Sequence, residues 1–514
     1  MAIFRKTALV SGITLALIGI SNVQAASTDA LEQRIRELES RLEKFEQATA
    51  PTTTAAAPSA EVEKLKGKIN TLERKFEVEQ EVTAANALKL PKFDAGADGF
   101  RISSQDGKHQ VRIRGAVQTD AKFFAEDHGG SRGSNGYTTG TGIPDQFNLK
   151  QARIWLEGKF FDNIYFKIMP DFAATNILPD AYLDYAYKSY ASLSVGKQKT
   201  PLSLERLQGD ADGMFLERAF PTYLASNRDV GVMLHGEFAK PGYKAEYGGP
   251  VDFKNFISYQ LGVFNGSGDN GNNNAGTFDD KEFDGRIWAH PFQHSGYNWL
   301  EGLGLGIAGS YSHPTGALDA SNKITGLAGP KLPSNIGQLT ITDLTGLAAE
   351  GSHIRVYPQA YWYAGPVGFM GEYVLSQSHL TNLTTNKNFA QNNSAWQAQL
   401  SYVLTGEDAS FQGVKPIQNF DLSAGTWGAL QFATRFSHLD IDPNTFSIGG
   451  VKNYQNVRQA ASWAVGLNWF LNQNAIIRAD YEETDFTGGA GVSAAKVSDR
   501  PKEKVFGTRF QLAF

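Results

Sequence analysis

The chain has 514 residues, with 48 lysines and arginines against 53 aspartates and glutamates, and a formal net charge of −5. This weak acidity excludes a generally basic surface for nucleic acid. The absence of cysteine excludes disulfides and thiol-bound metals or clusters. Because 12% of the residues are aromatic and glycine is abundant, the composition fits an exported β-barrel whose strands alternate apolar and polar residues.

The first 25 residues have the features of a secretory signal peptide. Arg5 and Lys6 precede an uncharged apolar run over residues 7–20, and residues 23–25 supply small side chains for cleavage. An uncleaved anchor helix is the alternative, but the run is too short to span a bilayer. Removing residues 1–25 leaves a mature net charge of 46 − 53 = −7.

Residues 26–90 are predicted to form a periplasmic coiled-coil region. Apolar residues recur at steps of four and three over residues 31–45 and again over residues 62–76, with a Pro/Ala/Thr linker at 48–60. The heptad phases do not match across the linker, so we expect separate coils; solitary amphipathic helices are the alternative. The residues at the a and d positions favour dimers, whereas the barrel described next favours trimers.

From residue 110 the apolar period changes to two, which is typical of strands with one polar and one apolar face. On the first strand, Arg112 and Arg114 share the polar face. The predicted fold is an all-β, sixteen-stranded antiparallel transmembrane barrel over residues 100–514, since bacterial barrels have even strand numbers. The sixteen expected strands are 110–124, 150–161, 163–172, 180–188, 191–198, 229–239, 256–265, 281–291, 302–312, 353–363, 366–377, 394–404, 427–438, 460–471, 475–485 and 503–514.

The links between these strands differ at the two ends of the barrel. Most odd-to-even links are long and rich in Gly, Asn and Ser, whereas residues 162–163, 364–365 and 472–474 make tight even-to-odd turns. Long external loops and short periplasmic turns are typical of such barrels. The link at 404–426 is long on the periplasmic side, so either it has a function or the strand count slips there.

The chain ends in an alternating strand with Phe510, Leu512 and Phe514 on its apolar face. A terminal aromatic residue of this kind is the signal that outer-membrane assembly machinery reads; an edge strand of a soluble sandwich is the alternative. Tyr and Trp near other strand ends are expected to form girdles against the outer-membrane lipids.

Residues 199–228 form a link long enough to indicate a functional loop. A sixteen-stranded barrel encloses an aqueous channel, and we expect this loop to fold inside and set the constriction. Arg206 and Arg218 would then present guanidinium groups, which suit phosphate and other oxyanions. The apolar anchors on the wall would be Leu202, Leu204, Phe215 and Leu216.

Several segments occur in an order and spacing that resemble one family: LKQARIWLEGKFF, DAYLDYAYKS, SVGKQKTPLSLERL, FLERAFP, ALQFATRFSHLD, AVGLNWFLNQN and GTRFQLAF. They resemble the phosphate-selective porin O/P family of Gram-negative outer membranes, over residues 100–514. The resemblance implies a homotrimeric porin whose pores carry phosphate or polyphosphate inward along basic residues.

By this resemblance, Arg206 and Arg218 match the basic pair at the constriction, Lys150 matches an arginine of the second strand, and Lys415 matches a basic residue on the periplasmic side. The other candidate anion contacts are Arg112, Arg114, Arg153 and Lys199. Each of these residues has an alternative role without anion binding. Inward charges also pair with facing carboxylates such as Glu157 or Asp184, and Lys199 is also a charge at the end of a strand.

The sequence departs from the family pattern where phosphate binding is expected to be strongest. Gln151 stands at the place of a second arginine, Ala116 at the place of one on the first strand, and Gly209-Asp210 at the place of a serine pair. Asp210 and Asp212 either soften an anion site or neutralise the arginines altogether. A general, weakly selective porin is therefore the alternative function.

Two further alternatives belong to other classes. The barrel could anchor a periplasmic tether made by the coil, or it could be an outer-membrane hydrolase with a Ser–His pair assembled in space. The chain lacks HExxH, GxSxG and P-loop motifs, so we expect no enzyme, no metal and no cofactor.

Overall fold

The computed structural model of the chain divides into two units, residues 1–92 with 104–106, and residues 93–103 with 107–514. It describes residues 33, 35–41, 43–44, 58–87, 91–125, 132–133, 136–137, 144–238, 256–272, 274–275, 279–293, 295–314 and 340–514. The predicted signal peptide lies outside these residues. Among the helices of these ranges, none combines the length and apolar character that crossing a membrane requires.

The first unit contains helix α2 (Pro58–Ala87). It begins inside the expected linker, because proline is well tolerated in the first turn of a helix, and it includes the second heptad pattern. Ile69, in the apolar stripe, is buried, whereas its neighbours Lys68 and Asn70 are exposed. Residues 35–41 are helical as well. Association of these helices into a coiled coil stays a prediction.

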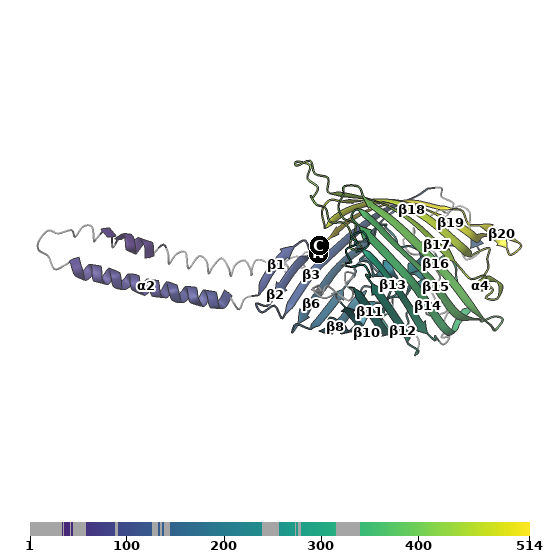
Figure 1. Ribbon diagram of the computed structural model, residues 1–514, viewed down its shortest axis with the longest axis horizontal. Helices are drawn as coiled ribbons and strands as arrows, with labels where there is room; N and C mark the ends of the chain where they lie inside the picture. Colours follow the sequence, from purple (N-terminus) through teal and green to yellow (C-terminus); the bar gives the residue numbers. More distant parts are fainter. Residues whose placement is uncertain are drawn as a thin grey trace, which may run out of the picture. The chain divides into compact units, whose positions relative to one another are not determined.

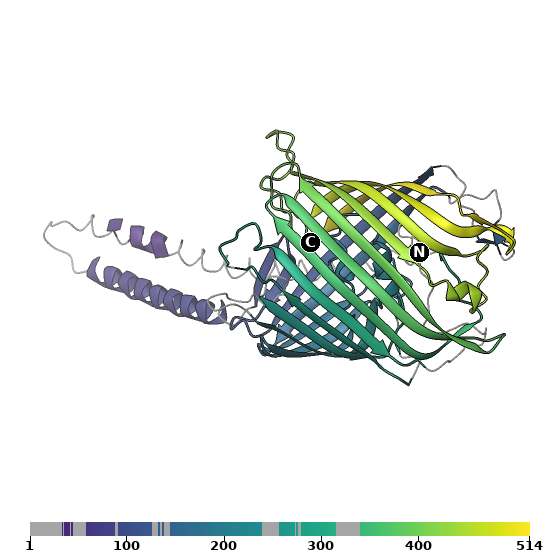
Figure 2. The same ribbon diagram turned by 45° about the vertical axis from the view of Figure 1, so that its right-hand side comes forward.

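The second unit contains a closed antiparallel barrel of sixteen strands, as expected. Its strands follow one another in chain order, and pairing of the last with the first, through Leu512 and Val117, closes the ring (Figures 1 and 2). The strands are β3 (Gln110–Ala125), β6 (Gln146–Phe160), β7 (Ile164–Met169), β8 (Asp180–Lys188), β9 (Ala191–Lys199), β10 (Arg228–Phe238), β11 (Ile257–Phe264), β12 (Glu282–Ala289), β13 (Leu303–Ser312), β14 (Leu347–Ala364), β15 (Val367–Asn382), β16 (Lys387–Val403), β17 (Ala429–Asp440), β18 (Val457–Phe470), β19 (Ala475–Ser493) and β21 (Glu503–Ala513).

Shorter strands extend the barrel at its ends. β1 (Lys92–Gly96) and β2 (Gly99–Ser103) form a hairpin, and β2 pairs with the start of β3 through Phe100 and Ile113. β20 (Lys496–Asp499) pairs with the end of β19. β4 (Arg132–Gly133) pairs with β5 (Gly136–Tyr137) in the first long link. One edge of β3 is thus shared between β2 and β21.

Four strands continue well beyond the expected ranges. β14, β15, β16 and β19 extend through residues 347–352, 378–382, 387–393 and 486–493, where polar residues and glycine are frequent. Backbone pairing in these strands continues beyond the residues that alternate between apolar and polar. The period-two pattern therefore predicts only part of each strand. β7, in contrast, ends before Pro170, which cannot donate a ladder hydrogen bond.

The two faces of the wall follow the predicted alternation. On β16, Trp396 and Leu400 are exposed on the outside, whereas Gln397 and Gln399 are buried on the inside. On β3, Lys122 points inward and is 1% exposed. The outer face is apolar and the interior is polar, the reverse of a soluble sandwich, as expected for a barrel surrounded by lipid.

We call the barrel end with the chain terminus the Phe514 end and the opposite end the loop end. The tight turns predicted at the Phe514 end are confirmed; one is built by Phe161 and Asp162, both with positive φ. The link at 404–428 is long, and the strand count does not slip there. Two more links at this end, 239–256 and 290–302, are also long, so the expectation of a single exception was wrong.

Candidate functional site

Residues 200–227 link β9 to β10 and lie inside the barrel. They contain a one-turn helix, α3 (Leu204–Leu207), and a 3-10 turn, η1 (Phe220–Leu224). Carbonyl oxygens of this loop accept hydrogen bonds from inward-facing side chains of β17, β18 and β19, half the ring away from β9 and β10. The pairs are Ala211 with Arg478 (2.5 Å), Met214 with Asn468 (3.1 Å) and Glu217 with Arg435 (2.7 Å).

Apolar and polar contacts together hold this loop. All of the predicted apolar anchors are buried, namely Leu202, Leu204, Phe215 and Leu216. Glu372 of β15 accepts hydrogen bonds from the Leu204 backbone N–H (2.8 Å) and the Ser203 hydroxyl (3.1 Å) at the start of α3. The carboxylate therefore satisfies donors that this short helix leaves without internal partners.

The segment of residues 404–428 supports the loop from the Phe514 end. The Gln208 side chain donates to the backbone oxygen of Phe411 (2.8 Å). The Phe411 ring stacks on Tyr361 with 5.3 Å between centroids and packs in one buried cluster with Leu204. Lys415 lies in this segment and is exposed, away from the loop contact.

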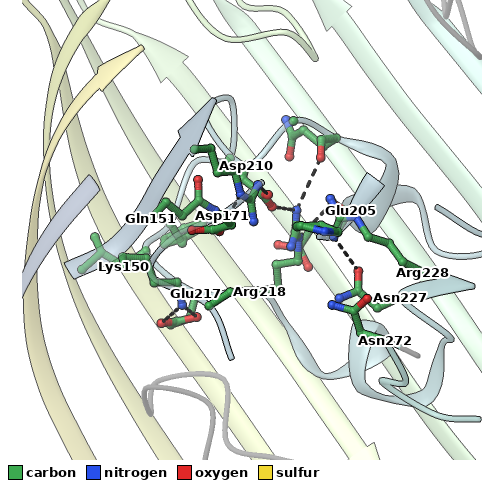
Figure 3. Close-up of a pocket in the computed structure, with 18 of the residues that line it drawn as sticks. Lys150, Gln151, Asp171, Glu205, Asp210, Glu217, Arg218, Asn227, Arg228 and Asn272 are labelled. Atoms are coloured by element: carbon green, nitrogen blue, oxygen red, sulfur yellow. Dashed lines mark hydrogen bonds and ion pairs between the residues drawn. The ribbon is translucent and has the colours of Figure 1, made fainter. Parts of the chain in front are cut away.

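A cavity of about 260 Å³ lies beside the loop (Figure 3). Charged side chains from β6, β10, β21, the loop and the link between β7 and β8 line it. Five are cationic and four are acidic: Lys150, Arg153, Arg218, Arg228 and Arg509 against Asp171, Glu205, Asp210 and Glu217. The cavity thus has nearly balanced charge, with the cations contributed by separate parts of the chain.

Asp210 occupies the space between two of these guanidinium groups. It forms ion pairs with Arg218 of the loop and with Arg153 of β6, and Arg153 also pairs with Asp171 at 2.7 Å. Burial alone would raise the pKa of Asp210, but Arg153 and Arg218 outweigh burial and hold this pKa well below its usual range. The carboxylate therefore stays ionised and partly neutralises both arginines.

Glu217 has the same relation to two lysines. Its carboxylate accepts from Lys150 of β6 at 2.6 and 2.8 Å and from Lys122 of β3 at 2.9 Å. Burial would raise the pKa of Glu217, but the lysines, with Arg509, lower it to about 2. Figure 3 shows the Lys150 ammonium group directed at this carboxylate.

Asp212 differs from its neighbour Asp210. Burial raises the pKa of Asp212 to about 6, against the opposing charges of Arg478, Arg114 and Lys199. Its charge therefore changes close to neutral pH, whereas that of Asp210 does not.

Arg206 does not line the cavity. Its guanidinium group donates to the Thr222 backbone oxygen at 2.9 and 2.6 Å and to the Asn270 side chain. Burial lowers the pKa of Arg206 to about 10. Arg206 joins the two halves of the loop. Lys199 has a similar position, since it donates to the Gln208 backbone oxygen at 3.0 Å.

The other predicted residues lie apart from the cavity. Arg112 and Arg114 point inward near the Phe514 end and pair with Glu157. Phe510, Leu512 and Phe514 point outward and are 54%, 41% and 37% exposed. Of the basic candidates, Lys150, Arg153 and Arg218 are brought together at one place.

Several members of the site were not among the residues predicted from the sequence. Lys122 and Arg509 face inward, and the period-two pattern of β3 and β21 could have found both. Glu217 belongs to the loop, which lacks that pattern. Asp171 lies at the end of the expected strand 163–172 and Arg228 directly before the expected strand 229–239, and no sequence signal marks the contact of these three residues with the cavity.

Residues 122–514 match the family model described as phosphate-selective porin O and P. No curated relative matches the chain. Among solved structures, the chain is similar to outer-membrane expressed OmpT of Vibrio cholerae, with 12% identity, coverage of 79% of this chain and 98% of that chain, and a TM-score of 0.46.

The chain is also similar to an anion-selective porin from Comamonas acidovorans, with 10% identity, coverage of 79% and 100%, and a TM-score of 0.45. A further similar structure is the outer membrane channel DcaP of Acinetobacter baumannii, with 11% identity, coverage of 80% and 99%, and a TM-score of 0.47.

Proposed function

Because the chain belongs to the phosphate-selective porin O and P family, we propose that it conducts phosphate or polyphosphate anions, with residues 200–227 as the constriction of its channel. The chain is a porin of the Gram-negative outer membrane, and its family and barrel fold point to a channel rather than an enzyme. Solutes cross such a barrel by diffusion through water.

The observation that carries the proposal is the convergence of cations on one cavity. Lys150 and Arg153 come from β6, Arg218 from the loop and Arg509 from β21, and all of them line the same space. Lysine and arginine groups facing a narrow pore attract and select anions. We assign the anion contacts to Arg218, Arg153 and Lys150, because Arg206 is turned into the loop.

A specific observation favours the second candidate, a general porin with weak selectivity. Arg153 and Arg218 share Asp210 as a partner, and Lys150 has Glu217. Paired cations present less net charge to a passing anion. The degree of selectivity therefore depends on how strongly these carboxylates compete with the solute.

The test is a measurement of reversal potential with purified protein in planar bilayers. A potassium chloride gradient reports the anion-to-cation permeability ratio, and added phosphate reports block of the chloride current. We expect anion preference and a current that falls as phosphate is added. Equal permeability with no phosphate block would favour the general porin.

We also propose the assembly that the family resemblance implies. The porin would be a homotrimer, with residues 26–90 in the periplasm and outward apolar residues against outer-membrane lipids. The assembly machinery would recognise the terminal strand through Phe510, Leu512 and Phe514, whose outward exposure supports this role.

A further inference from the structure

The backbone at Glu217 is fixed by hydrogen bonds, and its side chain contacts two neighbouring strands, β3 and β6. Its backbone oxygen accepts from Arg435 of β17 at 2.7 Å, and the preceding N–H, of Leu216, donates to Asp480 of β19 at 2.7 Å. These contacts fix the backbone against β17 and β19, while the carboxylate meets Lys122 and Lys150. The two lysines come from adjacent strands, β3 and β6.

This cluster opens into the cavity. Glu217 and Lys150 both line it, and the Lys150 side chain is 25% exposed, whereas that of Lys122 is only 2% exposed. An anion in the cavity can therefore approach Lys150 directly and, once the carboxylate moves aside, the more deeply placed Lys122. Arg509, on the same cavity, is already held by Asp120 at 2.6 and 2.7 Å.

We propose that Lys122 and Lys150 form a second oxyanion station in the channel, and that Glu217 is its tethered counter-ion, which a permeating phosphate displaces. This inference rests on the proposed function. It adds Lys122 to the anion path and makes Glu217 a residue that sets specificity. Asp210 has the corresponding place between Arg153 and Arg218.

The chemistry of the cluster matches an oxyanion. A carboxylate held by three short contacts from two ammonium groups occupies the position that phosphate oxygens would take, and lysine binds phosphate as a point charge. A tethered competitor is present at an effective concentration of about millimolar. Such competition weakens binding and speeds release, and a conducting channel needs binding that is weak enough for the ion to leave.

The experiment measures block of the chloride current by inorganic phosphate in planar bilayers, using full-length protein. Glu217→Gln keeps the shape of the side chain but removes the competing charge, so the block constant should become tighter by about tenfold. Glu217→Asp is too short to contact both lysines and should give an intermediate constant. Lys150→Met in the Glu217→Gln background should abolish the gain.

Asp408→Asn is the matched control, because Asp408 is an exposed carboxylate of the 404–428 segment and its change alters net charge by the same amount. A block constant unchanged by both Glu217 variants, or tightened equally by Asp408→Asn, would overturn the station. The reversal potential of the wild type tests the proposed function separately. The proposed station is tested by a different quantity, the ratio of the phosphate block constants of Glu217→Gln and the wild type. This ratio can be compared even if the wild-type channel has no anion preference.

Discussion

Arg206 and Arg218 lie on the same loop and have different tasks. Arg206 satisfies the backbone oxygen of Thr222 and is 6% exposed. Arg218 lines the cavity and pairs with Asp210. A buried guanidinium bound to backbone oxygens stabilises a loop conformation, whereas one that faces a cavity is placed where a solute can reach it.

Replacing Arg218 with alanine should weaken phosphate block about tenfold, because one charge-assisted contact contributes about 1.5–3 kcal/mol. The change also leaves Asp210 with one arginine in place of two, so the anion-to-cation permeability ratio should fall. Reversal potentials and phosphate titration in planar bilayers measure both effects.

Two variants serve as controls for this prediction. Lys496→Ala removes an exposed charge on β20 and should leave phosphate block unchanged. Arg206→Ala should instead loosen the loop and increase cleavage by protease within residues 200–227. If Arg206→Ala weakened block as much as Arg218→Ala, the separation of their roles would be wrong.

Asp212 should make the selectivity of the channel depend on pH. Its pKa of about 6 means that the side chain is ionised at pH 8 and neutral at pH 5. Lowering the pH through 6 therefore removes one negative charge beside the channel, and anion preference should rise. Reversal potentials measured from pH 8 to pH 5 test this rise, which Asp212→Asn should abolish by fixing the neutral state.

At the scale of elements, the loop is positioned by the wall rather than by its own secondary structure. α3 has a single turn, too short to be stable alone. Glu372 of β15 accepts hydrogen bonds from its first residues, and Leu204 packs with Trp288 and Met370. The position of the loop therefore depends on residues far away in the chain.

Glu372→Ala should release the start of the loop. The variant leaves the Leu204 N–H and the Ser203 hydroxyl without their acceptor, and each buried unpaired donor costs about 1–3 kcal/mol. Single-channel recordings should show a larger and noisier conductance. Glu350→Ala, at an exposed position of β14, should not change the noise; equal noise in both variants would contradict the anchor.

The strands of the barrel could be predicted from sequence because the alternation is imposed directly by lipid outside and water inside. The extensions of β14, β15, β16 and β19 and the short strands at the barrel ends were missed, since lipid imposes no pattern there. The site was less predictable: Leu202 and Leu204 were identified as anchors by their apolar character, but which arginine faces the cavity depends on how residues 204–224 turn. The contact of Glu217 with Lys122 and Lys150 could be seen only in the folded loop, because the two lysines come from β3 and β6.

At the scale of the whole molecule, the seam between β21 and β3 completes the ring. The backbone N–H groups of Gly115 and Phe514 each donate to the other's carbonyl oxygen, at 2.7 and 2.8 Å. The Phe514 ring lies over Gly115, so that a Cβ atom at residue 115 would be 2.5 Å from the ring. The ring also meets Phe100 of β2 edge-on at 6.3 Å.

Gly115→Ala should therefore reduce the amount of folded barrel in the outer membrane while export continues, because the added methyl group displaces the terminal ring. Phe514→Ala should have a similar effect by removing the ring itself. Quantifying the protein in outer-membrane and periplasmic fractions tests both. Gly285→Ala is the matched control, since its nearest neighbour would be 3.6 Å away; normal membrane levels of the Gly115 and Phe514 variants would contradict the role of the seam.

If the porin is a homotrimer, each insertion into a planar bilayer should raise the conductance in three equal steps, because each protomer has a channel of its own. Recordings at low protein concentration resolve these steps. Consistent single steps would contradict the trimer and leave the barrel unaffected.

The shared edge of β3 has a consequence for biogenesis. β2 covers the first residues of that edge and β21 covers the rest, so the partners of one strand come from the beginning and the end of the barrel sequence. A nascent chain cannot close until its final residues have been translocated, and every truncated product keeps unpaired backbone groups that chaperones and proteases of the periplasm can bind. Closure of the ring thus requires β21, and a product that lacks this strand keeps an open edge of β3 that chaperones and proteases can bind.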